Sequence, residues 1–230
     1  GGGRTAPLPV SGPVGTGEVV AGFNAAYRID AGYRAAHHGA DIADPAGFGG
    51  LAIEVRLPAG PGAPHILLEE GGLTIAVFAV NHAPVEPAFG YRIDYRGRSV
   101  VISGDTVFHP GLIAAARGVD VLFHEALEPD MVRAMSEAAA AGGNARIATI
   151  LNDILDYHAS PADAARAANE AEARDLVLIH IVPPLPSHIL DRRFVGDTRK
   201  LFGGRLTLAR DGLVVSLPAG TDAIYYRSRF

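Results

Sequence analysis

The stretch Ser99-Val100-Val101-Ile102-Ser103-Gly104-Asp105-Thr106 is an apolar run that ends in a glycine and an acid. Its β-branched residues predict a buried strand over residues 99–103. The glycine lets the backbone after this strand approach another group closely. An aspartate in such a position is often a metal ligand. The competing interpretation is a structural one, in which Asp105-Thr106 forms a turn before a helix that starts at Pro110.

Two further apolar runs end in a histidine. His82 follows Leu73–Asn81, and His180 follows Leu176–Ile179. Polar groups at strand ends gather where a sheet opens to solvent, so His82, Asp105 and His180 together predict one site. The alternative for each histidine alone is a structural role, in which its ring caps or fills the end of a strand.

The composition restricts which residues could hold a metal there. The sequence has no cysteine, so a metal would be held by His, Asp and Glu. Imidazole and carboxylate are suitable zinc ligands, and an aspartate can bridge two ions. Two such ions would bind and deprotonate a water and polarise the electrophile. His124-Glu125, at the end of a fourth apolar run, adds another imidazole and another acid to the predicted site.

Length and charge define the class of protein. The 230 residues are 48% hydrophobic and 20% charged, as in a globular protein that buries a sizeable core. No apolar run approaches the ~18 residues of a membrane helix, so no membrane partner is expected. The net charge is −5, and Lys200 is the sole lysine among 20 basic residues. The arginines are scattered, whereas a protein that binds nucleic-acid phosphates usually shows a basic patch.

Strands and helices alternate along the chain, which predicts an α/β layered fold. A helix is expected near Gly17–Ala36 with Thr16 as its N-cap, and Tyr95-Arg96-Gly97-Arg98 predicts a hairpin turn. Ser160, followed by Pro161 and Asp163, predicts the start of another helix. The remaining expected elements are strands over 73–80, 91–95, 119–123 and 176–179, helices over 130–141 and 145–157, and a last hairpin of strands 205–209 and 213–217.

Several of these stretches together resemble one family. They are Asn81-His82-Ala83-Pro84, Ser103-Gly104-Asp105-Thr106, Asp120–Ala126, and Tyr157–Ala165 with its continuation to His180. In order and spacing they resemble the metallo-β-lactamase-fold hydrolases, especially the branch that holds ribonuclease Z and the arylsulfatase-like enzymes. The resemblance implies an α/β fold of the αββα sandwich type, formed by one domain over residues 1–230 that is incomplete at its N-terminal end.

The resemblance also implies roles for single residues. His82, Asp105 and His180 match metal ligands, with Asp105 bridging two ions. His158 matches a catalytic histidine near the leaving group, and Glu125 matches the acid that orients it. The implied cofactor is zinc, two ions in a complete site, and the implied assembly is a homodimer.

One departure from the family bears on activity. The family signature His-x-His-x-Asp-His is absent, and the histidines before His82 are His37, His38 and His65, none with that spacing. The segment that carries it is therefore expected to be missing from this chain or to lie on another one. Three ligands spread over two metal positions should hold metal weakly or not at all, so this chain alone is expected to be nearly inactive.

The substrate prediction rests on two segments, one after the first helix and one after His180. Ribonuclease Z enzymes carry a basic arm, whereas residues 32–62 contain only Arg34 and Arg56 and no lysine. Ile181–Leu185 is apolar and, with Phe108, could line a pocket. These features predict a hydrolase of small esters, such as aryl sulfates, phosphodiesters or lactones, that acts through a metal-bound hydroxide. Nucleic acid is then an unlikely partner. The alternatives are a ribonuclease Z-like tRNA 3′-processing endonuclease and a non-catalytic binding module that has lost its metal site.

Overall fold

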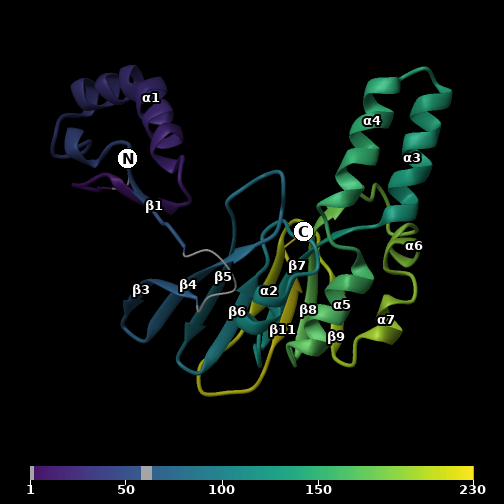
Figure 1. The fold of residues 1–230 in the computed structure, drawn as a ribbon. Coiled ribbons are helices and arrows are strands. Elements are labelled where there is room, and N and C mark those ends of the chain that lie inside the picture. The colour runs from purple at the N-terminus through teal and green to yellow at the C-terminus, as the bar shows by residue number, and fades with distance from the viewer. Residues whose placement is uncertain (1–2, 58–63, 230) are drawn as a thin grey trace. The chain divides into compact units, whose positions relative to one another are not determined.

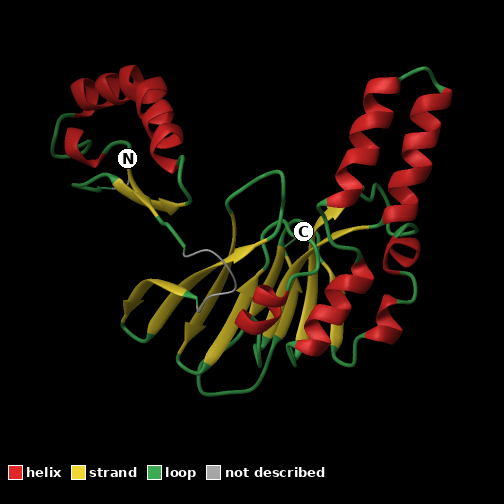
Figure 2. Cartoon of the chain, in the orientation of Figure 1, coloured by secondary structure: helices red, strands yellow, loops and turns green. Residues whose placement is uncertain are grey.

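The structure, a computed structural model, describes residues 3–57 and 64–229 and has a mixed α/β architecture (Figure 1, Figure 2). It consists of two compact units, residues 1–58 and residues 59–230. The predicted α/β class is confirmed. Within the described ranges, no helix combines the length and the apolar character that crossing a membrane requires.

The first unit is a strand–helix–strand motif. Strands β1 (Leu8–Gly12) and β2 (Gly50–Glu54) pair in parallel, and helix α1 (Thr16–His38) and the short 3-10 helix η1 (Pro45–Gly47) connect them. The predicted helix is confirmed, but Thr16 is not its N-cap. That position is Gly15, and the Thr16 hydroxyl donates to the carbonyl of Pro13. The first amides of the helix donate instead to the carboxylate of Glu54, which supplies negative charge at the positive end of the helix dipole.

The second unit is built on a seven-stranded sheet. Its strands, in spatial order, are β3 (His65–Glu70), β4 (Leu73–Val80), β5 (Ala88–Tyr95), β6 (Arg98–Ile102), β7 (Val121–Leu127), β8 (Asp175–Val182) and β9 (Arg205–Leu208). Neighbours from β3 to β6 are antiparallel, and neighbours from β6 to β9 are parallel. The predicted hairpin turn joins β5 to β6. Arg96 and Gly97 both have positive φ, 48° and 79°, as a tight two-residue hairpin requires.

Helices α2 (Pro110–Ala115) and α5 (Pro161–Glu170) pack against one face of this sheet (Figure 1). They cover the apolar core, in which Leu112, Leu122 and Leu176 are completely buried. Helices α3 (Pro129–Ala141) and α4 (Ala145–Asp153) form a hairpin that projects from the sheet, and the 3-10 helix η2 (Ile154–Asp156) leads from it back toward α5. Helices α6 (Asp191–Val195) and α7 (Thr198–Leu201) precede β9.

Helix α5 begins as the sequence predicts. The Ser160 hydroxyl accepts a hydrogen bond from the amide of Asp163 at 3.0 Å, and the Asp163 carboxylate accepts one from the amide of Ser160 at 3.3 Å. This reciprocal cap satisfies two amides that a helix start leaves unpaired. It also fixes the chain immediately after His158.

The predicted last hairpin is wrong. Strand β9 pairs in parallel with β8, while β10 (Leu213–Ser216) pairs with β11 (Tyr225–Ser228) in a separate sheet of two strands. The physical reason is burial, because Leu206 of β9 packs into the core and so draws this strand to the edge of the main sheet. The turn Arg210-Asp211-Gly212 therefore connects two sheets instead of two paired strands.

A buried ion-pair network ties the C-terminal segment to the sheet. The Asp120 carboxylate accepts two hydrogen bonds from the Arg98 guanidinium and one from Arg174. Arg98 also donates to the carbonyls of Thr221 and Ala223. The side chains of Arg98 and Asp120 are only 7% and 10% exposed, so each needs the other as a partner.

Replacing Asp120 by alanine should lower the free energy of unfolding by about 3–5 kcal/mol, because it leaves the Arg98 charge buried without a partner. Burial alone would raise the pKa of Asp120, but the amide of Ser99 and the two guanidinium groups outweigh it and hold the pKa below 3.8. The stabilisation is therefore present above pH 3.8 and is lost as the pH falls below that value. Urea unfolding at pH 7 and pH 3 measures both effects, and equal loss at both pH values would contradict this account.

Candidate metal centre

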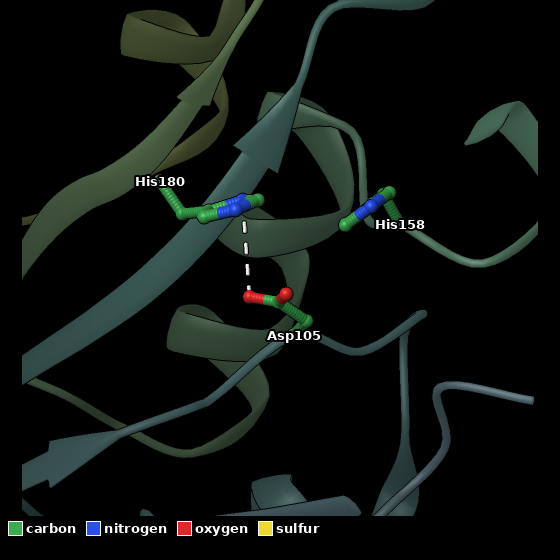
Figure 3. Close-up of side chains that lie close together, drawn as sticks. All are labelled: Asp105, His158 and His180. Carbon is green, nitrogen blue, oxygen red and sulfur yellow. Dashed lines mark ion pairs between the residues drawn. The ribbon is translucent and has the colours of Figure 1, made fainter. Parts of the chain in front are cut away.

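The loops at one edge of the sheet bring together the side chains that the sequence singles out. His82 follows β4, Asp105 follows β6, His158 precedes α5, and His180 lies in β8. Figure 3 shows the side chains of the last three lying close together, with the ion pair between His180 and Asp105 marked. The structure thus places in one cluster residues that are far apart in the sequence.

The spacing of these groups suits a metal ion. One ligand atom each from Asp105, His158 and His180 lies within 4.8 Å of the others. The Nδ1 atom of His180 is 3.8 Å from Oδ1 of Asp105, and Nε2 of His82 is 3.9 Å from Oδ2. These distances are too long for hydrogen bonds. Two ligand atoms on one tetrahedral zinc ion lie roughly 3.3–3.6 Å apart, given metal–ligand bonds of about 2.0–2.2 Å. The cluster therefore fits a cation with little rearrangement.

His180 reaches the cluster because its strand is locally irregular. The sequence predicted that the strand ends at this residue, but β8 continues to Val182. The pairing with β7 shifts register there, since Glu125 lies opposite Ile179 and Ala126 lies opposite Ile181. His180 is the extra residue and has a φ of 44°, a left-handed conformation that is unfavourable for a histidine. Such bulges re-aim side chains at functional sites.

Asp105 reaches the cluster through the glycine before it. Gly104 has a φ of 63°, and a Cβ atom on it would overlap the carbonyl oxygen of Phe89. Only glycine therefore allows β6 to leave the sheet so close to β5.

The Gly104→Ala variant should lose stability and metal affinity together. The positive φ alone costs about 1–3 kcal/mol, and the overlap with Phe89 would also displace Asp105. Gly97→Ala is the matched control, because Gly97 also has positive φ but open space around its Cβ position. Thermal unfolding of both variants, and cobalt titration of both in the full-length gene product, should show the larger loss for Gly104→Ala. Equal behaviour of the two would contradict the proposed close approach.

The buried carboxylate of Glu125 orients the ring of His158 through a hydrogen bond. The side chain of Glu125 is 1% exposed, and its Oε1 accepts hydrogen bonds from Nδ1 of His158 at 2.8 Å and from the amides of Thr106 and Ala159. Burial favours the neutral imidazole, but the hydrogen bond to Glu125 and the charges of Glu125 and Asp105 outweigh it and raise the pKa of His158 above its ordinary value. Because Nδ1 donates to Glu125, the other ring nitrogen is left for the cluster.

His82 is oriented in the same manner. Its Nδ1 donates to the carbonyl of Tyr157 at 2.9 Å, so Nε2 is the nitrogen on the side of Asp105. Its ring centroid is 5.0 Å from that of His158, which in turn stacks at 5.5 Å on His180. The partner of His82 is a main-chain group, and no residue type in the sequence could have indicated it.

The residues expected to line one substrate pocket lie in two different places in the structure. Ile181, Pro184 and Leu185 line a pocket of about 740 Å³ that also includes His180. Phe108 instead lies under the guanidinium of Arg166, 3.5 Å from the ring centroid, and packs against the core. The predicted apolar wall beside the site is thus found for the segment after His180.

The comparisons with known proteins agree with this geometry. Residues 4–181 match the family described as beta-lactamase superfamily domain. The ribonuclease Z of Mycobacterium avium (strain 104) is 37% identical over 206 residues, which cover 89% of this chain and 65% of that protein. A putative ribonuclease Z of Mycobacterium tuberculosis (strain CDC 1551 / Oshkosh) is 38% identical over 208 residues, with 90% and 82% covered. The chain thus spans about two thirds of the length of the first relative.

Two solved structures share the fold. The short form of human tRNase Z superposes with a TM-score of 0.55 at 21% identity and covers 92% of this chain and 67% of its own. A diphosphatase from the PhnP family gives a TM-score of 0.53 at 17% identity and covers 93% and 60%. Both likenesses concern the fold alone, and they confirm the metallo-β-lactamase fold expected from the sequence.

The prediction that nucleic acid is an unlikely partner is wrong, because the relatives are named ribonucleases and so act on RNA. Small esters as the substrate class find no support among them. The sequence argument rested on the scattered arginines and on the few basic residues in 32–62, but positions along the chain do not show how charges gather in space. It also judged charge on a chain that spans only part of the relative's length.

The family model, the relatives and the fold lead to one assignment, which the clustered acid and imidazoles at the sheet edge fit. The chain belongs to the metallo-β-lactamase superfamily, in its ribonuclease Z-like branch of hydrolases.

Proposed function

We propose that the protein is a metal-dependent hydrolase of RNA phosphodiesters, with tRNA 3′-end processing as its specific reaction. The observation that carries the proposal is the convergence of Asp105, His158 and His180 on one point, with Glu125 behind His158. The ribonuclease Z relatives supply the substrate class. One family match runs through both compact units, which supports the expectation of a single domain.

His82, Asp105 and His180 are proposed as ligands of the metal. A carboxylate and two imidazoles are the donor set that zinc accepts in proteins without cysteine ligands. When bound, the metal would polarise the phosphate and activate the attacking water. The two proposed histidine ligands are oriented by different features. A hydrogen bond to the Tyr157 carbonyl orients the ring of His82, and the bulge in β8 directs the side chain of His180.

His158 is proposed as the general acid. Its Nδ1 is held by Glu125, so the ring can present a proton on Nε2 to the leaving oxygen. The hydrogen bond from Nδ1 to Glu125 stabilises the protonated ring, which is the form that donates. The same nitrogen lies near the ligand atoms of Asp105 and His180, so metal coordination by His158 is the competing assignment.

The test is cleavage of an RNA that carries a 3′ extension by the full-length gene product. We expect cleavage that stops after chelation and returns on adding zinc. His65→Ala is a suitable control, because His65 is exposed on the edge strand β3 and remote from β8 in the sheet order. Metal-dependent hydrolysis of an aryl ester without RNA cleavage would overturn the substrate class, and cleavage that survives chelation would overturn the metal mechanism.

A further inference from the structure

The sheet opens at the candidate metal centre between β6 and β7. Their pairing ends at Ile102 and Phe123, and the last backbone bond runs from the amide of Ser103 to the carbonyl of Phe123 at 2.9 Å. In a parallel ladder, alternate residues bond to the same neighbouring strand. The next residue of β7 that would bond to β6 is therefore Glu125, but β6 has already turned away toward Asp105. The amide and the carbonyl of Glu125 lie in the interior and need other partners.

Two buried side chains take the place of the missing strand. The amide of Glu125 donates to the hydroxyl of Ser103 at 3.0 Å, and Nδ1 of His124 donates to the carbonyl of Glu125 at 2.7 Å. The Ser103 hydroxyl in turn donates to the carbonyl of Gly104 at 2.6 Å, so it also holds the turn that carries Asp105. Ser103, His124 and Glu125 are all completely buried.

His124 is otherwise hard to explain at this position. A carbonyl only accepts, so Nδ1 must carry the proton, and burial lowers the pKa of the ring and keeps it neutral. Its Nε2 is buried and has no hydrogen-bond partner within residues 3–57 and 64–229. An apolar side chain would avoid this unfavourable burial. Donation from Nδ1 to Glu125 is the interaction that accounts for a histidine here.

Glu125 is the point at which three parts of the centre meet. Its carboxylate binds His158, the amide of Thr106 next to Asp105, and the amide of Ala159. Its backbone lies opposite Ile179, the residue before His180. A shift of the Glu125 peptide would therefore move His158 relative to both Asp105 and His180.

We propose that Ser103 and His124 are positioning residues that clamp the Glu125 peptide where β6 leaves the sheet, and thereby set the geometry of the metal centre. Neither side chain needs to touch metal or substrate for this role. The functional meaning of the clamp rests on the hydrolase function proposed above. Its existence does not, because each hydrogen bond of the clamp joins two groups of the protein itself.

The test compares two amide variants of His124. The side-chain amide of asparagine can place an N–H near the position of Nδ1, whereas that of glutamine reaches the position of Nε2. Hydrogen exchange of the metal-free protein, followed by NMR, reports on the amides of Thr106 and Ala159, which donate to Glu125. The amide of Asp175, which bonds to Asp120 at the far end of the same strands, is the reference for global stability.

We expect His124→Gln to speed exchange at Thr106 and Ala159 by at least ~10-fold and His124→Asn by less than ~3-fold, with Asp175 unchanged in both. Equal effects of the two variants, or faster exchange at Asp175 as well, would overturn the clamp. If His124→Gln fails to fold, Ser103→Ala tests the clamp by removing the hydroxyl that accepts from the Glu125 amide. This variant should speed exchange at the same two amides, and unchanged exchange there would overturn the clamp.

Cobalt titration of the same variants separates the two proposals. Weaker binding by His124→Gln than by His124→Asn supports the clamp as a determinant of the metal centre, and equal binding by the two counts against that. These titrations use the full-length gene product, and absence of cobalt binding by it without substitutions would count against the proposed function and leave the exchange result to decide on the clamp.

Discussion

The Asp105→Ala variant should lose metal binding and RNA hydrolysis together. Ring nitrogens of His82 and His180 each lie less than 4 Å from a carboxylate oxygen of Asp105. The Asp105 carboxylate is therefore common to every proposed metal position. Loss of an outer partner of a ligand typically costs ~10–100-fold in metal affinity or activity, and loss of this shared ligand should exceed that range. Isothermal titration with zinc and an RNA cleavage assay, both on the full-length gene product that carries the substitution, measure the two effects.

A suitable control for Asp105→Ala is Asp222→Ala, an exposed acid between β10 and β11 that lies outside the cluster and outside the pocket beside His180. It should bind zinc and cleave RNA as the unchanged protein does. Retention of zinc affinity by Asp105→Ala within about threefold would remove the carboxylate from the centre and with it the proposed mechanism.

The second large effect is expected for His158→Ala. A general acid contributes ~10²–10⁴-fold to turnover, so kcat should fall by that factor. The zinc content should stay the same, because His82, Asp105 and His180 remain. Single-turnover cleavage and elemental analysis of the same preparation of the full-length gene product give both numbers.

Elemental analysis also separates the two assignments of His158. A loss of zinc in parallel with turnover would identify His158 as a ligand, which its distance from Asp105 and His180 also allows. A decrease in kcat of less than tenfold, with the zinc content unchanged, would contradict both assignments. His65→Ala again serves as the control for loss of an imidazole that lies outside the cluster.

The sequence was informative wherever a local rule governs the structure. Leu73–Val80 is found as predicted, the Arg96-Gly97 turn adopts the required positive φ values, and Ser160 caps its helix. Asp105 and His180 of the cluster were singled out because each stands at the end of an apolar run, whereas His158 was expected from the family resemblance. These features depend on neighbours in the chain, which the sequence shows directly.

The sequence was uninformative wherever a distant group decides. Glu54 caps α1 in place of Thr16, although it is more than thirty residues away. The pairing of β9 with β8 follows from burial of Leu206, and the bulge at His180 follows from its register against β7. The ring of His82 is oriented by a hydrogen bond to a main-chain carbonyl. Every residue has such a carbonyl, so no sequence pattern marks it. The substrate class failed for a different reason, since charge counts do not give the distribution of charge in space.

The most direct test of the metal centre is diffraction from crystals grown with zinc, measured on both sides of the zinc absorption edge. We expect an anomalous peak within about 2.0–2.2 Å of a carboxylate oxygen of Asp105 and of a ring nitrogen of His180 or His82. A zinc peak elsewhere in the molecule, or none within bonding distance of Asp105, would contradict the account.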